Sequence, residues 1–313
     1  MRRTLAILMT VFTGTVFGAD YIKITIPTTA TVTKIFFNSD QIGWAATSKG
    51  EVLSSFDGGK TWKLVTATSK AIKDIHFNNR VGYIVGERGL LMKSTNGGAT
   101  WQDLSLNMQY NFTGVGISDD TTVIICGTDQ NSMSKTKGVV FESRDNGATW
   151  KKHPWTLGNG YTDLAVYGPR KVYLLAIKKT FHSISNGTRY FSGTYEGDRM
   201  GLGFDFIDDW GFMVGHKGYF AYSNTHGRKW QEIADSNLTI DLFAVEMFDR
   251  NSGVAVGQDG TLMFFYDDGQ RRVMENCGYK NTLRTVCITG NKMFVGGEDG
   301  LMMYQERFPR AKN

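Results

Sequence analysis

The eight-residue stretch SFDGGKTW, residues 55–62, decides the fold because it is repeated along the chain. Five further copies follow it: STNGGATW (94–101), SRDNGATW (143–150), SISNGTRY (183–190), SNTHGRKW (223–230) and FYDDGQRR (265–272). A spacing of about forty residues is typical of repeat architectures in which each repeat is one supersecondary unit. The one long interval contains the polar insert TDQNSMSKTKG at 128–138. Internal repetition therefore sets the architecture.

Each repeat contains three runs rich in β-branched and aromatic residues, separated by turns that contain glycine. Such runs predict short β-strands, and no stretch keeps a helical period for long. The repeated eight-residue stretch is called the box from here on. A fourth short strand follows each box, as in TWKLV at 61–65. The first runs of the seven units are TKIFF (33–37), KDIHF (73–77), TGVGI (113–117), TDLAV (162–166), LGFDF (202–206), FAVEM (243–247) and RTVCI (284–288).

Seven units of four strands predict an all-β fold, a seven-bladed β-propeller with the boxes as turns between strands three and four. The seventh unit lacks its own fourth strand, because the chain ends soon after LMMYQER (301–307). The run YIKITI (21–26) is an unmatched strand ahead of the first complete unit. We expect this N-terminal strand to close the ring and hide its sheet edges. The predicted propeller is a single domain over residues 19–313.

The boxes are interpreted as scaffold. Their acid can accept backbone N–H groups inside the turn, their glycine suits a left-handed backbone, and their tryptophan returns to the apolar layer. A catalytic role is the alternative, but Asn96, Ser185 and Thr225 replace the acid without breaking the period. The structural box residues are Ser55, Asp57, Gly59, Trp62, Ser94, Asn96, Gly98, Trp101, Ser143, Asp145, Gly147, Trp150, Ser223, Gly227 and Trp230.

The stretches GWAATSKGEVLSSFDGGKTW (43–62) and GYIVGERGLLMKSTNGGATW (82–101) resemble the repeats of the photosystem II stability/assembly factor family. That family is part of the wider class of Asp-box (BNR) propellers, which also includes sialidases. The resemblance covers nearly the whole mature chain. It implies a non-enzymatic propeller that binds membrane-protein subunits during assembly. The box is specific for the fold and weak evidence for function, and a photosynthetic role does not follow from it.

A binding surface is expected on the face without boxes, where the turns between strands two and three lie. These turns are basic in blades one to five and acidic in blades six and seven, and aromatic residues lie in the blade-to-blade connections. A solvated rim with random charges, and core packing of the aromatics, are the alternatives. The candidate binding residues are Arg88, Lys135, Lys137, Trp155, Tyr161, Lys178, Lys179, Tyr195, Arg199, Lys217, Tyr279 and Lys280.

Residues 1–18 have a basic start, an apolar stretch and small residues before the expected cut, as in a secretory signal peptide. A buried first strand or an uncleaved anchor are the alternatives. The segment predicts a periplasmic or secreted protein, and no cysteine near the cut favours a lipid anchor. No later stretch resembles a transmembrane helix. Removing Arg2 and Arg3 lowers the net charge from +5 to +3, too little to argue for nucleic acid.

Cys126 is expected to be a buried thiol, and Cys277 and Cys287 are a candidate disulfide pair. The five histidines show no metal-ligand spacing, so no metal or other cofactor is expected. The rival function is a sialidase-like glycoside hydrolase or a glycan-binding propeller. Its early Arg-Ile-Pro motif is absent, since Thr25 precedes the only early Ile-Pro. We therefore expect no catalytic residue, and a protein-binding assembly or stability factor for envelope or membrane-protein complexes.

Overall fold

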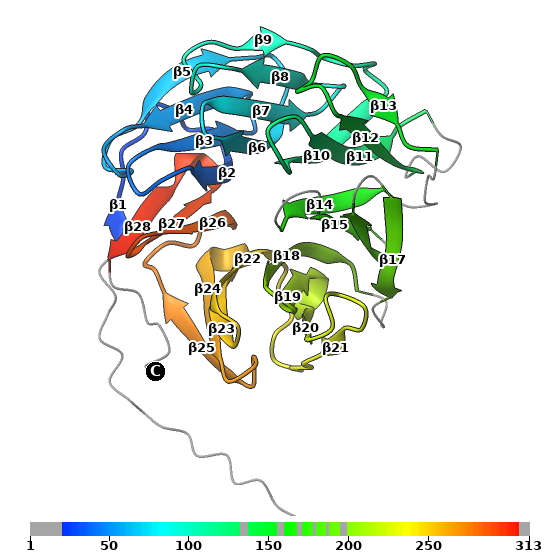
Figure 1. Ribbon diagram of the computed structural model, residues 1–313. Coiled ribbons are helices and arrows are strands. Elements are labelled where there is room, and N and C mark those ends of the chain that lie inside the picture. Colours follow the sequence, from blue (N-terminus) through cyan, green and yellow to red (C-terminus); the bar gives the residue numbers. More distant parts are fainter. Residues whose placement is uncertain are drawn as a thin grey trace, which may run out of the picture.

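The computed structural model describes residues 21–131, 137–154, 160–167, 171–177, 180–185, 188–194 and 199–306. These residues form seven four-stranded antiparallel sheets arranged as blades around a central axis (Figure 1). Within a blade the strands follow one another outward from the axis. The seven-bladed propeller predicted from the repeats is confirmed.

The blades are numbered in chain order. Blade 1 contains β2 (Val32–Phe37), β3 (Gly43–Thr47), β4 (Glu51–Ser55) and β5 (Lys63–Ala67), and blade 2 contains β6 (Ile72–Asn78), β7 (Val81–Gly86), β8 (Leu91–Ser94) and β9 (Gln102–Asp103). Blade 3 contains β10 (Tyr110–Ile117), β11 (Val123–Asp129), β12 (Lys137–Ser143) and β13 (Lys151–Lys152), and blade 4 contains β14 (Tyr161–Val166), β15 (Lys171–Ala176), β16 (Thr180–Ser185) and β17 (Thr188–Thr194). Blade 5 contains β18 (Gly201–Ile207), β19 (Trp210–Gly215), β20 (Phe220–Ser223) and β21 (Gln231–Glu232), and blade 6 contains β22 (Leu242–Asp249), β23 (Ser252–Gly257), β24 (Thr261–Tyr266) and β25 (Arg271–Asn276). Blade 7 contains β26 (Leu283–Thr289), β27 (Lys292–Gly297), β28 (Met302–Glu306) and, as its outer strand, β1 (Ile22–Lys23).

The ring closes through the N-terminal strand, as expected. Ile22 of β1 pairs with Tyr304 of β28 and Lys23 pairs with Met303. Beyond the strand, the Ile24 N–H donates to the Met302 carbonyl at 2.9 Å, and the Ile24 side chain is buried. The two ends of the described chain are thus held in one sheet, and no edge of blade 7 is left beside β28.

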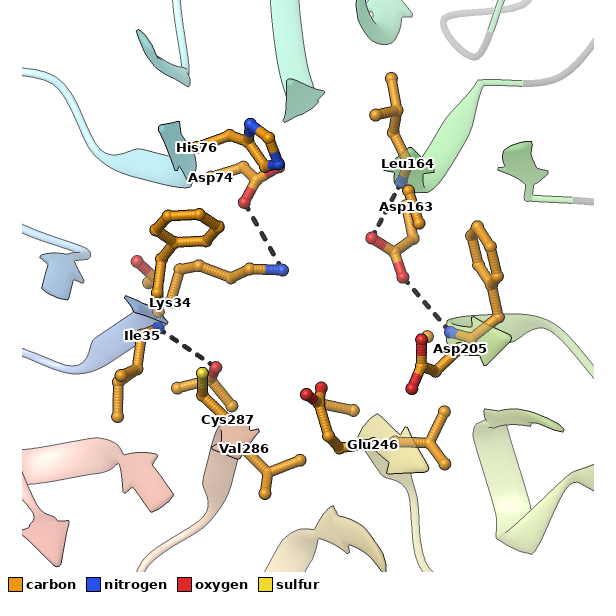
Figure 2. Close-up of a pocket in the computed structure, with 18 of the residues that line it drawn as sticks. Lys34, Ile35, Asp74, His76, Asp163, Leu164, Asp205, Glu246, Val286 and Cys287 are labelled. Carbon is orange, nitrogen blue, oxygen red and sulfur yellow. Dashed lines mark hydrogen bonds and ion pairs between the residues drawn. The ribbon is translucent and has the colours of Figure 1, made fainter. Parts of the chain in front are cut away.

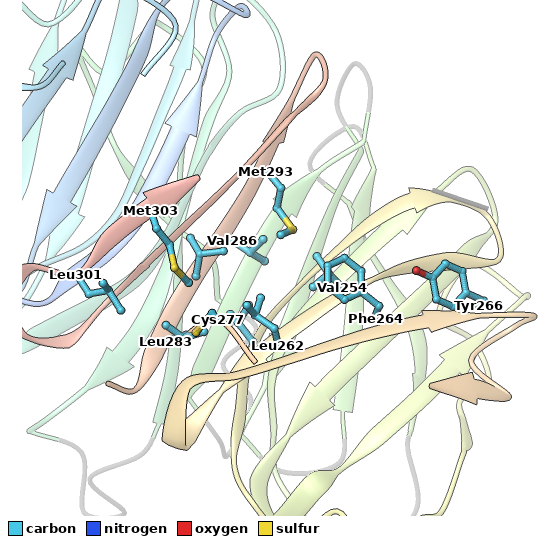
Figure 3. Packing of buried hydrophobic residues seen from close by; sticks show 12 residues of the cluster. Val254, Leu262, Phe264, Tyr266, Cys277, Leu283, Val286, Met293, Leu301 and Met303 are labelled. Carbon is cyan, nitrogen blue, oxygen red and sulfur yellow. The ribbon is translucent and has the colours of Figure 1, made fainter. Parts of the chain in front are cut away.

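The core lies between the blades, because each sheet packs both of its faces against a neighbour. Every residue of β11 is buried, whereas β5 is mostly exposed. Between blades 6 and 7, Val254 and Phe264 pack with Val286, Met293 and Met303 (Figure 3). Each such side chain contributes about 1.5–3 kcal/mol of apolar burial. Sequence runs with no polar side therefore become the middle strands of the blades.

Two faces of the ring are distinguished by their turns. The box face carries the turns between strands one and two and the box turns between strands three and four. The loop face carries the turns between strands two and three and the connections from one blade to the next. On the loop face, η1 (His216–Gly218), η2 (Gln258–Gly260) and η3 (Glu298–Gly300) are one-turn 3₁₀ segments of blades 5, 6 and 7.

In the box of blade 1, the side chains satisfy the backbone of the turn. Ser55 Oγ donates to Asp57 Oδ1 at 2.8 Å and accepts the Gly59 N–H at 2.9 Å. Asp57 accepts the Thr61 N–H at 3.0 Å and the Thr61 hydroxyl at 2.6 Å. The Thr61 hydroxyl and N–H bonds lower the pKa of Asp57 to about 2. The Trp62 indole N–H donates to the Gly59 carbonyl at 2.9 Å, so the tryptophan closes the turn.

The boxes of blades 2, 3 and 5 repeat the serine bond. Ser94, Ser143 and Ser223 accept the N–H groups of Gly98, Gly147 and Gly227, respectively, at 2.8, 2.7 and 3.0 Å. Where Asn96 or Thr225 replaces the acid, its side chain still accepts a backbone N–H, from Thr100 and Lys229 respectively. The substitutions keep an acceptor in place, which explains why the period survives them. The Trp101 indole N–H donates to the Gly98 carbonyl, whereas the Trp150 ring packs between blades 2 and 3 and the Trp230 ring between blades 4 and 5.

The box glycines also fit the boxes against the preceding blade. Gly147 has a φ of 80°, and a Cβ there would lie 2.5 Å from the Tyr83 hydroxyl of blade 2. Gly59 has a φ of 78°, and a Cβ there would lie about as close to the Phe294 ring of blade 7. Any larger residue would be strained and would collide with the neighbouring aromatic ring.

The disulfide prediction is wrong, because Cys277 and Cys287 are free thiols. Cys277 follows β25 and is buried between blades 6 and 7, with its thiol 3.4 Å from the Gly260 carbonyl. Cys287 lies on β26, the innermost strand of blade 7, where its side chain lines the axial channel (Figure 2). The Cys277 thiol therefore lies in the core between blades 6 and 7, whereas the Cys287 thiol faces the axial channel. Cys126 is buried, as expected.

No helix in the described part of the chain is long and apolar enough to cross a membrane. The signal-peptide prediction for residues 1–18 lies outside the described residues.

Candidate functional site

The axial channel is built by a bulge that recurs in the innermost strand of every blade. The pairing of strands one and two is interrupted by one extra residue on strand one in all seven described blades. A bulge re-aims the side chains that follow it. The extra residues are Thr33, Lys73, Thr113, Thr162, Leu202, Phe243 and Arg284.

Threonine at this position joins one blade to the next. Thr33 Oγ1 donates to the Ile72 carbonyl of blade 2 at 3.0 Å, and Thr162 Oγ1 donates to the Gly201 carbonyl of blade 5 at 3.2 Å. Thr113 repeats the bond toward blade 4 at 2.9 Å. These hydroxyl bonds join the innermost strands of neighbouring blades, which belong to different sheets and share no backbone ladder.

Three aspartates make the matching ties to backbone N–H groups. Asp74 accepts the Ile75 N–H of its own strand and the Val115 N–H of blade 3, each at 2.9 Å. Asp163 accepts the Leu164 N–H at 2.9 Å and the Phe204 N–H of blade 5 at 3.3 Å. Each carboxylate thus bridges two blades.

Asp205 makes the same tie between blades 5 and 6. It accepts the Phe206 N–H and the Met247 N–H of blade 6, each at 2.8 Å, and the Tyr167 hydroxyl at 2.7 Å. Tyr167 belongs to blade 4, so this carboxylate joins three blades. Burial raises the pKa of Asp205, and its hydrogen bonds oppose that rise.

These groups line a cavity of about 470 Å³ on the axis. Figure 2 shows the ammonium of Lys34 and the carboxylates of Asp163 and Glu246 pointing into the same space. Lys34 Nζ lies 3.6 Å from Asp74 Oδ1, and the negative charge of Asp74 raises the pKa of Lys34. Burial raises the pKa of Asp163 to about 6 and that of Glu246 to about 8. The channel therefore holds more carboxylates than cations and resists their full ionisation.

Two further titratable groups face the channel. Burial lowers the pKa of His76 to about 4, which favours its neutral form, and burial raises the pKa of Cys287. Within the described residues, no group of three or more His, Cys, Asp or Glu side chains could hold a metal ion. The channel carboxylates already accept backbone N–H bonds from adjacent blades, so the arrangement fits a structural ring with a polar lumen.

The loop face surrounds one end of this channel and carries several of the sequence-predicted binding residues. Arg88, Lys137, Lys217 and Lys280 are exposed there. Arg88 and Lys217 have left-handed φ values of 55° and 52°, which hold each at the tip of its turn. Lys135, Trp155, Lys178, Lys179 and Tyr195 lie outside the described residues.

Ion pairs occupy some of the charges of this face. Lys73 Nζ lies 2.8 Å from Glu87, and Arg284 lies 2.6 Å from Glu298. Arg199 pairs with Glu232 and also donates to the Lys217 carbonyl at 3.1 Å. Among the described residues, no ion pair forms at Lys49, Arg88, Lys217 or Lys280. The described part of the loop face thus includes four exposed cations that no ion pair neutralises.

The two predicted aromatic residues that the structure describes on the loop face, Tyr161 and Tyr279, do not form an exposed patch. Tyr161 is the first residue of β14 and is 1% exposed, packed with Ile124 and Cys126 between blades 3 and 4. Its prediction as a surface contact is therefore wrong, because strand one already begins at this residue. Tyr279 is half-buried against the core of blades 6 and 7, with Lys23 Nζ 5.6 Å from its ring centroid.

This architecture also matches a known protein family. The model of the photosynthesis system II assembly factor YCF48 matches residues 17–195, more than half of the 313 residues. The chain belongs to the YCF48 family. This confirms the family resemblance noted in the repeats. Comparison with curated proteins gives no match.

Solved structures of YCF48 share the fold. One, described as YCF48 bound to D1 peptide, has a TM-score of 0.72 and 18% identity, covering 91% of this chain and 94% of that one. YCF48 from Cyanidioschyzon merolae has a TM-score of 0.75 and 15% identity, covering 92% and 99%. The WD40 propeller of Doa1 scores 0.71 at 13% identity, covering 93% and 98%. Because a WD40 propeller aligns about equally well, these structural similarities show the fold alone.

The charged side chains that line the axial channel of this YCF48-family chain were not predicted from the sequence, although the sequence contains a signal for them. When the seven first runs are aligned, their second positions are Lys34, Asp74, Gly114, Asp163, Gly203, Ala244 and Thr285, and their fourth positions are Phe36, His76, Gly116, Ala165, Asp205, Glu246 and Cys287. Charged residues at alternate positions of otherwise apolar strands indicate a shared polar surface. Only closure of the ring shows that this surface is the lumen.

Proposed function

We propose that this protein is a non-catalytic assembly or stability factor that holds an acidic segment of a partner protein on its loop face. The observation that carries the proposal is the set of four cations without an ion pair, Lys49, Arg88, Lys217 and Lys280. They surround the axial channel on rigid turns, where a complementary anionic partner would be oriented as it binds. Asp259 in blade 6 makes one side of the loop face less basic, and this uneven charge would orient a bound partner.

Family membership supports a protein as the partner. A YCF48 solved with a D1 peptide shows that a relative of similar shape accepts a polypeptide segment. We extend this to a membrane-protein subunit or an envelope complex as the partner class here. The basic and apolar segment at 1–18 supports export to the periplasm or the exterior. The net charge of +3 that remains without Arg2 and Arg3 gives no argument for nucleic acid as the partner.

The decisive experiment is a quantitative pull-down from detergent-solubilised envelope extracts. The Arg88→Glu/Lys217→Glu variant reverses two of the four cations on exposed turns that carry no core contact. Its matched control, Lys60→Glu/Arg228→Glu, reverses two exposed cations on the box face. We expect capture of the specific partner to fall by about tenfold or more with the first variant and to stay unchanged with the control. Equal capture by both variants would contradict the proposal.

A sialidase-like activity is the competing function, and a fluorogenic sialoside tests it. Sialidases hold the substrate carboxylate with several arginines, whereas Arg284 is the only arginine among the described residues that line the channel. Arg284 is also paired with Glu298. We expect no turnover above a buffer control, and robust turnover would overturn the non-catalytic assignment.

A further inference from the structure

The outer strand of blade 6 differs from the outer strands of most other blades. β9, β13 and β21 are two residues long and polar, with the sequences QD, KK and QE, whereas the outer strands β5 and β17 of blades 1 and 4 have five and seven residues. β25 is six residues long, with the sequence RRVMEN, and lies at the circumference of the ring (Figure 1). Propellers and other sheet proteins normally protect an edge by keeping it short or charged. Blade 6 has a charged edge strand that is nevertheless about 20 Å long.

This edge is open and exposes two apolar side chains. Val273 is 40% exposed and Met274 is 52% exposed. β25 is the last strand of its sheet, and no described residue forms a backbone hydrogen bond to its outer side. The edge can therefore accept a further strand.

The charged residues of β25 restrict which partner strand can pair with its open edge. Arg271 forms an exposed ion pair with Asp267 of its own blade at 3.2 Å, with 57% and 70% of the two side chains exposed. Such surface pairs contribute little, so Arg271 can exchange this partner. Glu275 forms no ion pair with any described residue. The Glu275 carboxylate accepts a hydrogen bond from the Tyr21 hydroxyl at 3.0 Å. Arg271 and Glu275 are four residues apart in a strand, so both lie on the same side of the sheet as Val273.

We propose that β25 pairs antiparallel with β25 of a second copy of this chain, in a register centred on Val273. In this register Val273 opposes Val273 of the other copy, and Arg271 opposes Glu275 twice, once on each side of the two-fold axis. The apolar contact is thus flanked by two opposite-charge cross-strand pairs. The interface uses the same surface on both copies, as a closed dimer requires.

One strand pair buries less surface than a stable dimer, so the association is weak and depends on concentration. Burial raises the pKa of Glu275, and a guanidinium from the other copy would relieve the cost of its charge. A shift of one residue would place Arg271 against Met274 and lose both charge pairs. The charges therefore select one register.

Cysteine cross-linking tests the register directly on the full mature chain. In an antiparallel pair, opposed Cα atoms lie about 4.5–5.5 Å apart, a distance that a disulfide spans. We expect Val273→Cys to form a covalent dimer under mild oxidation. Met274→Cys opposes Arg272 in this register, so it should cross-link far more slowly. Wild type, with its three native cysteines, is the background control. Equal cross-linking of both variants, or none, would overturn the proposal.

Sedimentation velocity over a range of about 10 µM to about 1 mM tests the energetics. Val273→Lys places two like charges at the two-fold axis and should abolish the concentration dependence, whereas Leu64→Lys, an exposed position on β5 that is 50% accessible, should keep it. Arg271→Glu should weaken association by about tenfold, and Arg271→Glu/Glu275→Arg should restore it, because the pairs are exchanged. Far-ultraviolet circular dichroism checks that each variant is folded. A wild type that remains monomeric at every concentration, or association that Val273→Lys leaves intact, would refute the dimer.

Discussion

Lys34 and Asp74 form an ion pair inside the propeller ring, joining blade 1 to blade 2 with 3.6 Å between Nζ and Oδ1. Lys34 faces the axial cavity together with Asp163, Asp205 and Glu246 (Figure 2). Lys73 and Arg284 also line this cavity, but they pair with Glu87 and Glu298. Lys34 is therefore the cation that balances the inner carboxylates.

The first prediction concerns this balance. Lys34→Met keeps the length of the side chain and removes its charge, leaving Asp74 buried without a cation. We expect the free energy of unfolding at neutral pH to fall by about 1–3 kcal/mol, less than for a fully buried pair because Lys34 contacts channel solvent. Urea denaturation measures it. Lys63→Met, on the exposed β5, is the control and should change little; an equal loss in both variants would argue against a special role.

A second prediction follows from the pKa of Glu246, which burial raises from 4.5 to about 8. The folded state therefore holds this proton more tightly than the unfolded chain. Its contribution to stability is complete below about pH 4.5 and is lost as the pH rises through about 8. Glu246→Gln removes this loss, so it should be more stable than wild type above about pH 8, by about 1–2 kcal/mol, and similar near pH 5. Thermal melting across this range measures the difference; a constant difference would contradict the argument.

The third prediction concerns the boxes. Ser94→Ala removes the acceptor of the Gly98 N–H, which is 2.8 Å away, and leaves that buried donor unsatisfied. We expect a loss of about 1–2 kcal/mol in unfolding free energy, measured by urea denaturation. Thr95→Ala in the same box is the control, because Thr95 is exposed. If both variants lose the same stability, the hydroxyl bond is not the cause.

Ring closure gives a fourth prediction. Ile24 is 4% exposed and packs with Met302 and Phe294, whereas Ile22, two residues earlier, is 46% exposed. Ile24→Ala should lower the unfolding free energy by about 2–4 kcal/mol, and Ile22→Ala by less than about 0.5 kcal/mol. The pair is compared by calorimetry. Similar small effects would mean that the N-terminal segment does not hold the ring.

The fifth prediction tests the free thiols. With Cys277 and Cys287 unbridged, the unfolded protein should react with three equivalents of a maleimide without prior reduction. Dithiothreitol should also leave the melting temperature unchanged, because there is no covalent loop to open. Mass spectrometry counts the labels. One label and a reductant-sensitive melting temperature would restore the disulfide.

The sequence by itself determined the number of blades, the place of the boxes and the closure by the N-terminal strand. These features depend on residues close together in the chain, such as Ser55, Asp57 and Gly59, whose bonds lie within one turn. Spacing in the sequence is enough to specify such bonds, and repetition then counts the blades.

Tertiary structure alone decided which side chains meet across blades. Tyr161 is buried rather than exposed, Cys277 and Cys287 lie in different compartments, and Lys34 meets Asp74 only because the seven bulged strands converge on one axis. The physical reason is that these contacts depend on bulge direction and ring closure. A strand pattern gives the side of the sheet on which a residue lies, and the neighbour that covers that side is set by how the blades pack.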